Sequence, residues 1–333
     1  MHRTQPNRRR LILVASAASA GVAALSAWPL AVRAQAAWPQ RTVKLVVPFP
    51  PGGPVDAVAR VLAARLSELW GQQVLVDNRP GAGGQVGADL AAKATDGHTL
   101  FACSIHHTVL PSLKGRLPYD IQKDFVPLSF GARFPVVLVT HPSVEAKTVA
   151  ELIALAKKQP GKLSYASSGN GGGTHLAGEL FAIQSGTQLV HVPYKGSAPA
   201  MSDVLGGQVP LMFSDAPTAL PQWKAGKVRA LGVANAKPSV LFPGVPAIAE
   251  SGLPGYEAYS WTGYVAPASM PRDAASRAAA DIQRVLAEPA IAQRLHDAGA
   301  EAAPNSPEAF GRFIADELAK WTRVVKTANI QAD

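Results

Sequence analysis

The chain has 333 residues, of which 47% are hydrophobic, with 29 glycines and 28 prolines. This composition is typical of a globular protein with many ordered loops and excludes an intrinsically disordered chain. More than half of the formal charge of +9 lies in residues 1–34, which carry five arginines and no acidic residue; the remainder has 27 basic and 23 acidic residues. That remainder has no Lys/Arg cluster interleaved with aromatic residues, so we expect no nucleic-acid partner.

The N-terminal segment has the layout of a secretory signal peptide. Three arginines at 8–10 precede an Ala-, Ser- and Gly-rich apolar stretch that Pro29 interrupts. Small residues around Ala34 and Ala36 fit the pattern that signal peptidase cleaves. We therefore predict a signal peptide over 1–34, cleaved near Ala34 or Ala36, and a periplasmic protein; the alternative is a permanent membrane anchor. The twin arginine is compatible with export by the Tat route as well as by the general secretory route.

From residue 43 onward, short apolar segments alternate with amphipathic ones, which is the pattern of βα units around a parallel sheet. The predicted strands cover 43–48, 73–77, 98–103, 125–130, 135–140, 163–167, 189–192, 209–213, 228–233 and 261–266. The predicted helices cover 54–70, 84–93, 148–158, 174–185, 197–206, 216–225, 246–251, 273–287, 289–298 and 307–327. The fold class predicted from this pattern is α/β.

Two strand-rich passages, 125–140 and 256–267, are predicted to cross between two lobes. One lobe then comprises 38–138 plus 252–333, and the other comprises 139–251. Two strands that link two α/β lobes form a hinge, and small ligands usually bind between such lobes.

Two of the predicted strands run directly into Gly-rich loops that open helices. The loop 48–54 reads PFPPGGP, and the loop 168–174, more than a hundred residues later, reads SGNGGGT. A helix start with bare backbone N–H groups is a ready binding site for an anion. Two such starts predict one acidic ligand held between two lobes.

Several residues near these loops are given structural roles. Asp56 is expected to cap the helix start with its carboxylate, and Arg79 is expected to pair with an acid. The single cysteine, Cys103, is interpreted as a small buried residue at a strand end rather than a catalytic thiol.

The histidines do not have the spacing of a metal site. His106 and His107 follow a predicted strand, where neighbours point to opposite faces, so one of them is expected to face the ligand as a hydrogen-bond donor. His175 has two open interpretations, a donor to the anion or a local cap. Lys195 is either a cationic partner of the ligand or a solvated loop residue. We expect neither a metal nor a cofactor.

The common catalytic and nucleotide motifs are missing from the sequence. Gly169, Gly171 and Thr174 nearly match a dinucleotide fingerprint, but the next strand, 189–192, is not followed by the acidic residue that binds the ribose. There is no Gly-Lys-Ser/Thr phosphate loop, His-Glu-x-x-His zinc helix or Gly-x-Ser-x-Gly elbow.

Eight segments together resemble the periplasmic receptors of tripartite tricarboxylate transporters, often called Bug proteins. They are 38–39 (WP), 48–56 (PFPPGGPVD), 77–84 (DNRPGAGG), 117–120 (LPYD), 165–169 (YASSG), 175–179 (HLAGE), 192–196 (VPYKG) and 252–256 (GLPGY). The resemblance covers essentially the whole mature chain.

This resemblance implies a two-lobed, periplasmic-binding-protein-like fold of type II, with two hinge-linked α/β domains and a ligand cleft between them. It also implies a solute receptor rather than an enzyme. Such a receptor captures a small organic acid and delivers it to membrane permease subunits. The acids considered are di- or tricarboxylates, aromatic carboxylates and acidic amino acids, and the receptor is expected to be a monomer.

Carried over residue by residue, the resemblance places the ligand in the loop after the first strand, the loop 104–108, the Ser/Gly loop of the other lobe and the segment after Phe213. The predicted ligand-binding residues are Phe49, Pro50, Gly52, Gly53, Ser104, His106, His107, Ser167, Ser168, Gly169, Thr174, His175, Lys195 and Asp215. The chain departs from the family at Leu110, where an Asn is common, and at 214–215, where Ser-Asp replaces a frequent Asp-Asn pair. His106 and His107 beside Leu110 suit an aromatic acid.

Two alternative functions remain open at this point. An exported hydrolase needs a nucleophile with a base in reach, and Ser168 with His175 is the only pair that the sequence offers. A protein that presents its ligand to a membrane sensor kinase cannot be separated from a transport receptor by sequence.

Overall fold

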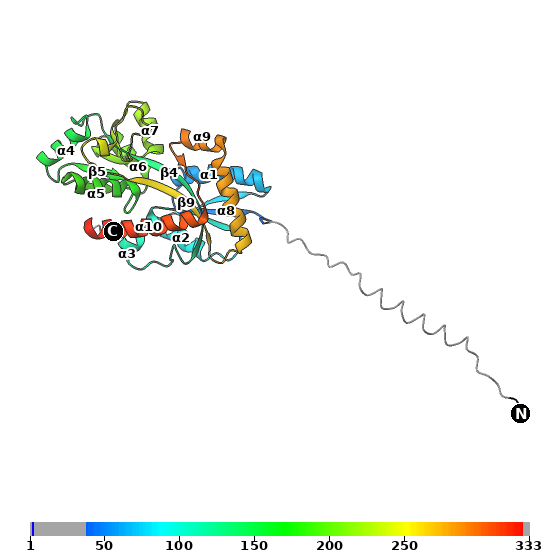
Figure 1. Ribbon diagram of the computed structural model, residues 1–333. Coiled ribbons are helices and arrows are strands. Elements are labelled where there is room, and N and C mark those ends of the chain that lie inside the picture. Colours follow the sequence, from blue (N-terminus) through cyan, green and yellow to red (C-terminus); the bar gives the residue numbers. More distant parts are fainter. Residues whose placement is uncertain (1, 3–37, 329–333) are drawn as a thin grey trace. The chain divides into compact units, whose positions relative to one another are not determined.

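The computed structural model describes residue 2 and residues 38–328 (Figure 1). Apart from His2, the predicted signal peptide and its cleavage sites lie outside the described residues. Among the residues described, no helix is long and apolar enough to cross a membrane.

The first group of elements forms a parallel α/β unit. Its members are β1 (Val43–Val47), α1 (Pro54–Trp70), β2 (Val74–Asn78), the short 3-10 helix η1 (Ala82–Gly84), α2 (Gln85–Ala92), β3 (Thr99–Ser104) and α3 (His106–Lys114). Strand β1 pairs in parallel with both β2 and β3. Helix α1 has the bounds expected from its sequence, because Pro54 starts it and Gly71, with a φ of 62°, ends it in the left-handed region.

The second group repeats the arrangement with different residues. It contains α4 (Val149–Lys158), β5 (Ser164–Ser167), α5 (Gly173–Ser185), β6 (Val190–Pro193), α6 (Ser197–Leu205), β7 (Leu211–Asp215), α7 (Ala216–Lys224), β8 (Arg229–Val233) and the 3-10 helix η2 (Ile248–Glu250). Strand β5 pairs in parallel with β6 and β7. In Figure 1 the helices α4 to α7 gather on one side of the unit formed by residues 38–328, and α1, α8 and α9 gather on the other.

Two long strands run between these groups: β4 (Phe125–Thr140) and β9 (Tyr259–Pro267) (Figure 1). The part of β4 up to Pro135 pairs with β9, and the part from Val136 pairs with β7 and β8. The described strands therefore join into one sheet in the order β2-β1-β3-β9-β4-β7-β5-β6, with β8 and β10 (Glu301–Ala302) pairing with β4 outside this order.

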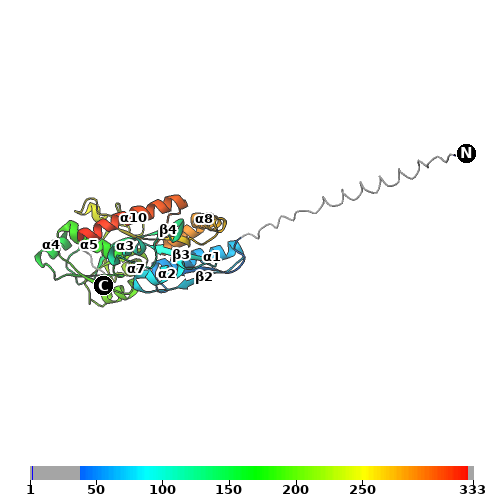
Figure 2. The same ribbon diagram turned by 90° about the horizontal axis from the view of Figure 1, so that it is seen from below.

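The C-terminal part of the chain returns to the first group. It consists of α8 (Arg272–Ala287), α9 (Pro289–Asp297) and α10 (Pro307–Ala328). Helix α10 lies alongside α3 (Figures 1 and 2), where the hydroxyl oxygens of Ser112 and Thr322 are 2.7 Å apart.

The apolar core divides at the middle of β4. Two clusters of buried residues draw on the chain before 135 and after 260, and two others draw on 136–258. Leu176 of α5 is the exception, because it belongs to the cluster that contains Val109 and Trp261. The start of α5 therefore packs against residues of the first group.

The predicted elements need correction at several places. No helix was predicted over 106–114, whose first part was described as the loop 104–108, but this segment forms helix α3 despite Pro111. The two strands expected at 125–130 and 135–140 are one continuous β4, because two irregularities in its register with β9 accommodate the intervening residues. The helix expected at 246–251 is only the 3-10 turn η2, and β10 was not predicted.

Candidate functional site

The predicted site residues lie at the carboxyl ends of two groups of parallel strands and in the loops that follow them. The parallel strands β1, β2 and β3 end at Val47, Asn78 and Ser104, and the parallel strands β5, β6 and β7 end at Ser167, Pro193 and Asp215. Ligands of open α/β sheets bind outside the carboxyl ends of the strands. The loops that follow these strands are therefore the expected location of a binding site.

Helix α1 begins at the first of these loops, residues 48–53, without a side-chain cap. Its N-cap residue is Gly53, with φ −78° and ψ 167°, and Pro54 follows at the first helical position. The N–H groups of a first turn have no partner inside the helix. Those of Val55 and Asp56 are thus directed out of the helix end, where the helix dipole favours a negative charge.

Asp56 stabilises this loop rather than the ligand. Its carboxylate accepts hydrogen bonds from the backbone N–H of Gly52 at 2.9 Å, from Arg60 at 2.9 Å and from Asn78 at 2.8 Å. Burial raises the pKa of Asp56, but these hydrogen bonds outweigh it and hold the pKa below its usual value. Asp56 therefore has a structural role, but the predicted cap of the helix start was wrong, because its carboxylate bonds Gly52 ahead of the helix and α1 has no side-chain cap. The N–H of Gly52, which we expected to serve the ligand, is bonded to Asp56 instead.

Two other structural interpretations are confirmed. Arg79 pairs with Asp77 at 2.9 Å. Cys103 is a fully buried free thiol on β3, and its S–H lies 3.4 Å from the carbonyl oxygen of Gly263.

The two neighbouring histidines lie on the first turn of α3 and not on a strand, so the opposite-faces argument for them was wrong. His107 is fully buried, and its Nδ1 accepts the backbone N–H of Ser104 at 3.0 Å. His106 is partly exposed, its ring centroid is 4.9 Å from that of Phe49, and its Nδ1 lies 3.4 Å from the Ser104 hydroxyl. Of the pair, His106 is the one that adjoins the first loop.

Burial keeps both of these imidazoles neutral. It lowers the pKa of His106 to about 3, with a further contribution from His107 and His175. It lowers the pKa of His107 to about 4, against hydrogen bonds to the backbone at Ser104 and Gly84. A neutral imidazole presents one donor and one acceptor, so His106 can donate to a ligand without carrying charge.

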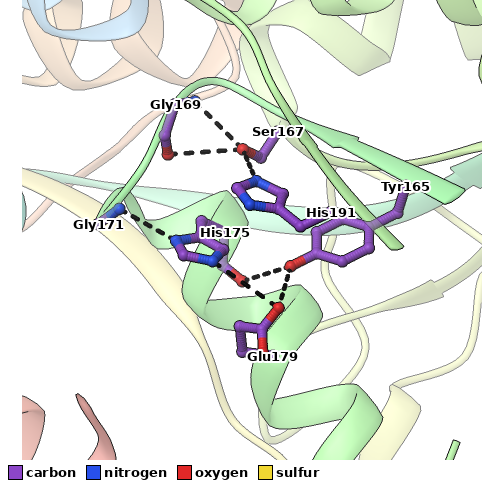
Figure 3. Close-up of polar contacts among 7 residues, drawn as sticks. All are labelled: Tyr165, Ser167, Gly169, Gly171, His175, Glu179 and His191. Atoms are coloured by element: carbon purple, nitrogen blue, oxygen red, sulfur yellow. Dashed lines mark hydrogen bonds and ion pairs between the residues drawn. The ribbon is translucent and has the colours of Figure 1, made fainter. Parts of the chain in front are cut away.

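The second loop, residues 168–172, is held by short hydrogen bonds within the loop and to its neighbours. Thr174 Oγ1 accepts the backbone N–H of Ser168 at 3.0 Å and lies 2.8 Å from the Ser168 hydroxyl oxygen. The Ser167 hydroxyl oxygen lies 2.6 Å from His191 Nε2 and accepts the backbone N–H of Gly169 at 3.2 Å (Figure 3). Ser167 and Thr174 are fully buried, and their hydroxyls hold the loop by accepting hydrogen bonds from its backbone.

Helix α5 starts from this loop in the same manner as α1 starts from the first. Its N-cap residue is Gly172, with φ −80° and ψ 164° and no side-chain hydrogen bond to the helix end. Both predicted helix starts are thus capped by an extended glycine, which leaves first-turn N–H groups for an anion.

His175 belongs to a local network, as Figure 3 shows. Its Nδ1 accepts the backbone N–H of Gly171 at 3.1 Å, and its Nε2 lies 3.7 Å from a carboxylate oxygen of Glu179. Its ring stacks on His191 at 3.9 Å and 6°. The local-cap interpretation therefore describes these contacts of His175, and the Ser168 hydroxyl lies 2.8 Å from Thr174 Oγ1.

The second loop packs directly against α3. A Cβ atom at Gly171 would lie 2.8 Å from Leu113 Cδ1, and one at Gly172 would lie 2.8 Å from His106 Nε2. Both positions therefore require glycine for close approach of the backbone. The His106 imidazole lies between Phe49 of the first loop and Gly172 of the second, so it links the two predicted helix starts.

The last two predicted residues differ in exposure. Lys195 is exposed in the loop after β6, which fits the solvated interpretation. Asp215 is only 5% exposed at the end of β7, and burial raises its pKa to about 6 against the lowering effect of the Ser260 and Ser197 hydroxyls.

Sequence reasoning missed Ser197 and Ser260. Ser260 lies on β9, and a Cβ atom on Gly173 of α5 would meet its side chain. The signal that was available is that Ser260 is a small polar residue in a largely apolar crossing strand. Within residues 38–328, no group of three or more His, Cys, Asp or Glu side chains is placed to hold a metal ion.

A two-lobed α/β fold with loops meeting between two parallel strand groups is that of the periplasmic binding proteins. The solved structure of Rpa4515 from R. palustris with adipate is 37% identical, with a TM-score of 0.85, over 89% of this chain and 99% of that one. The structure of MatC from Rhodopseudomonas palustris with bound malate is 31% identical, with a TM-score of 0.80, over 86% of this chain and 100% of that one.

The sequence comparisons narrow this class to one family. The family model described as tripartite tricarboxylate transporter family receptor matches residues 58–330, and the chain belongs to this family. Protein BugT of Bordetella pertussis is 38% identical over 292 residues, which is 87% of this chain and 90% of that protein.

Proposed function

We propose that this protein is a periplasmic receptor that captures a small organic acid and delivers it, as a monomer, to the permease of a tripartite tricarboxylate-type transporter. Its family and the carboxylates bound by two relatives support this function. The observation that carries it is the pair of helix starts, α1 and α5, with glycine N-caps and His106 between them. No group in this arrangement has to form a covalent bond with the ligand.

The carboxylate binds where the two loops meet. The N–H groups at the starts of α1 and α5 supply the positive ends of two helix dipoles, each worth roughly 0.3–1 kcal/mol to a nearby anion and more when partly buried. The predicted residues of the first loop, Phe49, Pro50 and Gly53, shape one side. The hydroxyl of Ser168 and the imidazole of His106 supply polar groups, and the exposed Lys195 adds a positive charge after β6.

Closure of two lobes completes the site. The division of the core near residue 135 and near residue 260 supports two lobes close to the predicted ones, 38–138 plus 252–333 and 139–251, with residues 253–258 packing in the second. Strands β4 and β9 are then the hinge, and the contact between α3 and the second loop is made in the closed form. A ligand shifts the equilibrium between the open and closed forms only by the difference between its binding free energies for the two forms.

A thermal-shift screen tests the binding of carboxylates. We expect one or a few acids to raise the melting temperature of the mature protein, by roughly 4–6 °C at a ligand concentration about one hundred times Kd. The matched control is the diamide of each acid, such as adipamide for adipate, which has the same skeleton without the charge. Stabilisation by the amide equal to that by the acid, or by sugars alone, contradicts the proposal.

The ligand itself has to be found by this screen. Adipate and malate, bound by the two relatives, differ in length and in the hydroxyl group of malate. The chain departs from the family at Leu110, which is within van der Waals reach of a Cβ atom at Gly83, and at 214–215, where β7 ends.

The proposal also includes export of the protein to the periplasm with cleavage of its signal peptide. The full chain expressed in a Gram-negative host is expected to yield a periplasmic protein that begins directly after Ala34 or Ala36, by intact-mass measurement. Replacement of Arg8 and Arg9 by lysines should block export only if the Tat route is used. Recovery of the uncut chain from the membrane fraction would point to the permanent anchor.

A further inference from the structure

Asp215 is an unusual residue for a site that binds an acid. It ends β7, where it is 5% exposed, and its main chain is fixed by pairing with Val136 of β4. Its Oδ1 is buried and has no hydrogen-bond partner among the described residues. A buried carboxylate oxygen without a partner is costly, so it indicates a group that is completed by something else.

The carboxylate is not used to stabilise the fold in the usual way. Asp215 occupies the N-cap position of α7, but its side chain makes no capping hydrogen bond to that helix. Its polar neighbours are the hydroxyls of Ser197 and Ser260, which lower its pKa without preventing the rise caused by burial. Both neighbours are themselves at most 8% exposed.

The position of Asp215 is close to the start of α5. Ser260, a neighbour of the Asp215 carboxylate, also lies against Gly173, the first residue of α5. Strand β7 pairs in parallel with β5, so both strands end at the same edge, and the second loop follows β5. An acid whose carboxylate lies at the α5 start therefore brings its other substituents near Asp215.

We propose that Asp215 selects ligands that carry a hydrogen-bond donor, a hydroxyl or an ammonium group, in addition to their carboxylate. This inference rests on the proposed function. The free Oδ1 accepts the donor, and a ligand without one leaves that oxygen buried and unpaired in the closed form. The ligand class is then a hydroxy acid or an amino acid rather than a simple carboxylic acid. A site built to hydrogen-bond a substituent rejects analogues that lack it.

The test uses acids that differ only in the donor. Suitable sets are succinate, malate and aspartate; glutarate, 2-hydroxyglutarate and glutamate; and benzoate, 4-hydroxybenzoate and 4-aminobenzoate. Isothermal titration calorimetry of the mature protein is carried out well above pH 6, where Asp215 is ionised. In the set that binds, we expect a donor-bearing acid to bind at least roughly tenfold more tightly than its donor-free counterpart.

Two substitutions separate the role of Asp215 from the rest of the site. Asp215→Leu removes the acceptor and should bring the affinities within a set to within about threefold of each other. Asp215→Asn removes the negative charge beside the anionic ligand and should raise the affinity for the donor-free acid. Asp316→Asn, an exposed position on α10, is the matched control, and melting temperatures without ligand verify that each variant is folded.

The outcomes are distinguishable. Equal affinities within a set for the wild-type protein, or a donor preference that survives in Asp215→Leu, overturns the role of Asp215 and leaves carboxylate binding intact. Failure of every acid in the sets and in the wider screen overturns the proposed function, and the inference about Asp215 with it.

Discussion

Replacement of Gly172 by alanine is expected to weaken ligand binding by roughly 5- to 150-fold, which corresponds to about 1–3 kcal/mol of overpacking in a closed interface. Gly172 has φ −80° and ψ 164°, which alanine adopts without strain. The added methyl group would lie 2.8 Å from His106 Nε2 and 2.9 Å from its Cε1. The substitution therefore opposes the contact between the second loop and α3 while leaving the backbone of each partner unstrained.

Affinity and melting temperature measured together check this prediction. The control is Gly206→Ala, at the end of α6, where the nearest atom to the new methyl group is 3.5 Å away and φ is −80°. Gly206→Ala should bind the acid as the wild type does. Should Gly172→Ala retain wild-type affinity, the packing of α3 on the second loop would not belong to the ligand-bound state.

Acidification from pH 7 to pH 5 is expected to reduce the free energy of unfolding by several kcal/mol. Burial lowers the pKa of His107 to about 4, of His106 to about 3 and of His191 to about 4, from an unfolded value of 6.5. Below pH 6.5 the unfolded chain takes up protons that the folded protein does not, so stability is present above that pH and is lost as the pH falls. The loss is about 2 kcal/mol for His107 and less for the two partly exposed residues. Asp215 acts in the opposite direction, because its pKa is raised to about 6.

Urea denaturation at the two pH values measures this effect. His107→Asn keeps an acceptor for the Ser104 N–H but cannot titrate, so its stability should depend less on pH than that of the wild type. His296→Asn on α9, an exposed position, is the control and should keep the wild-type dependence. A wild-type protein equally stable at both values would show that these imidazoles are not buried neutral.

The elements predicted from the sequence are correct where local signals are complete. Helix α1 was predicted with its observed bounds, because a proline at its start, a glycine at its end and a regular apolar face all agree. Helix α3 was missed because Pro111 interrupts a short segment without clear periodicity. Its stability comes from packing against α10 and the buried cluster around Val109, which local sequence does not reveal.

Strand β4 illustrates the same limit in a sheet. Gly131 and two prolines divide its sequence into apparent halves, yet β4 is continuous, because its register with β9 shifts twice and the Tyr264 ring occupies the space beside Gly131. A shift in register depends on the partner strand, so only the paired structure shows it.

By itself, the sequence determined the α/β class, the two Gly-rich helix starts and the family, because these depend on neighbours along the chain. The tertiary structure alone decided that His106 lies between the two loops, that His175 bonds within its own loop, and that Asp215 is buried with a free oxygen. The positions of His106 and Asp215 depend on contacts between residues more than twenty positions apart, and the bonding of His175 depends on which backbone groups lie within its reach. Packing of the folded chain sets these contacts, and residue spacing in the sequence does not reveal them.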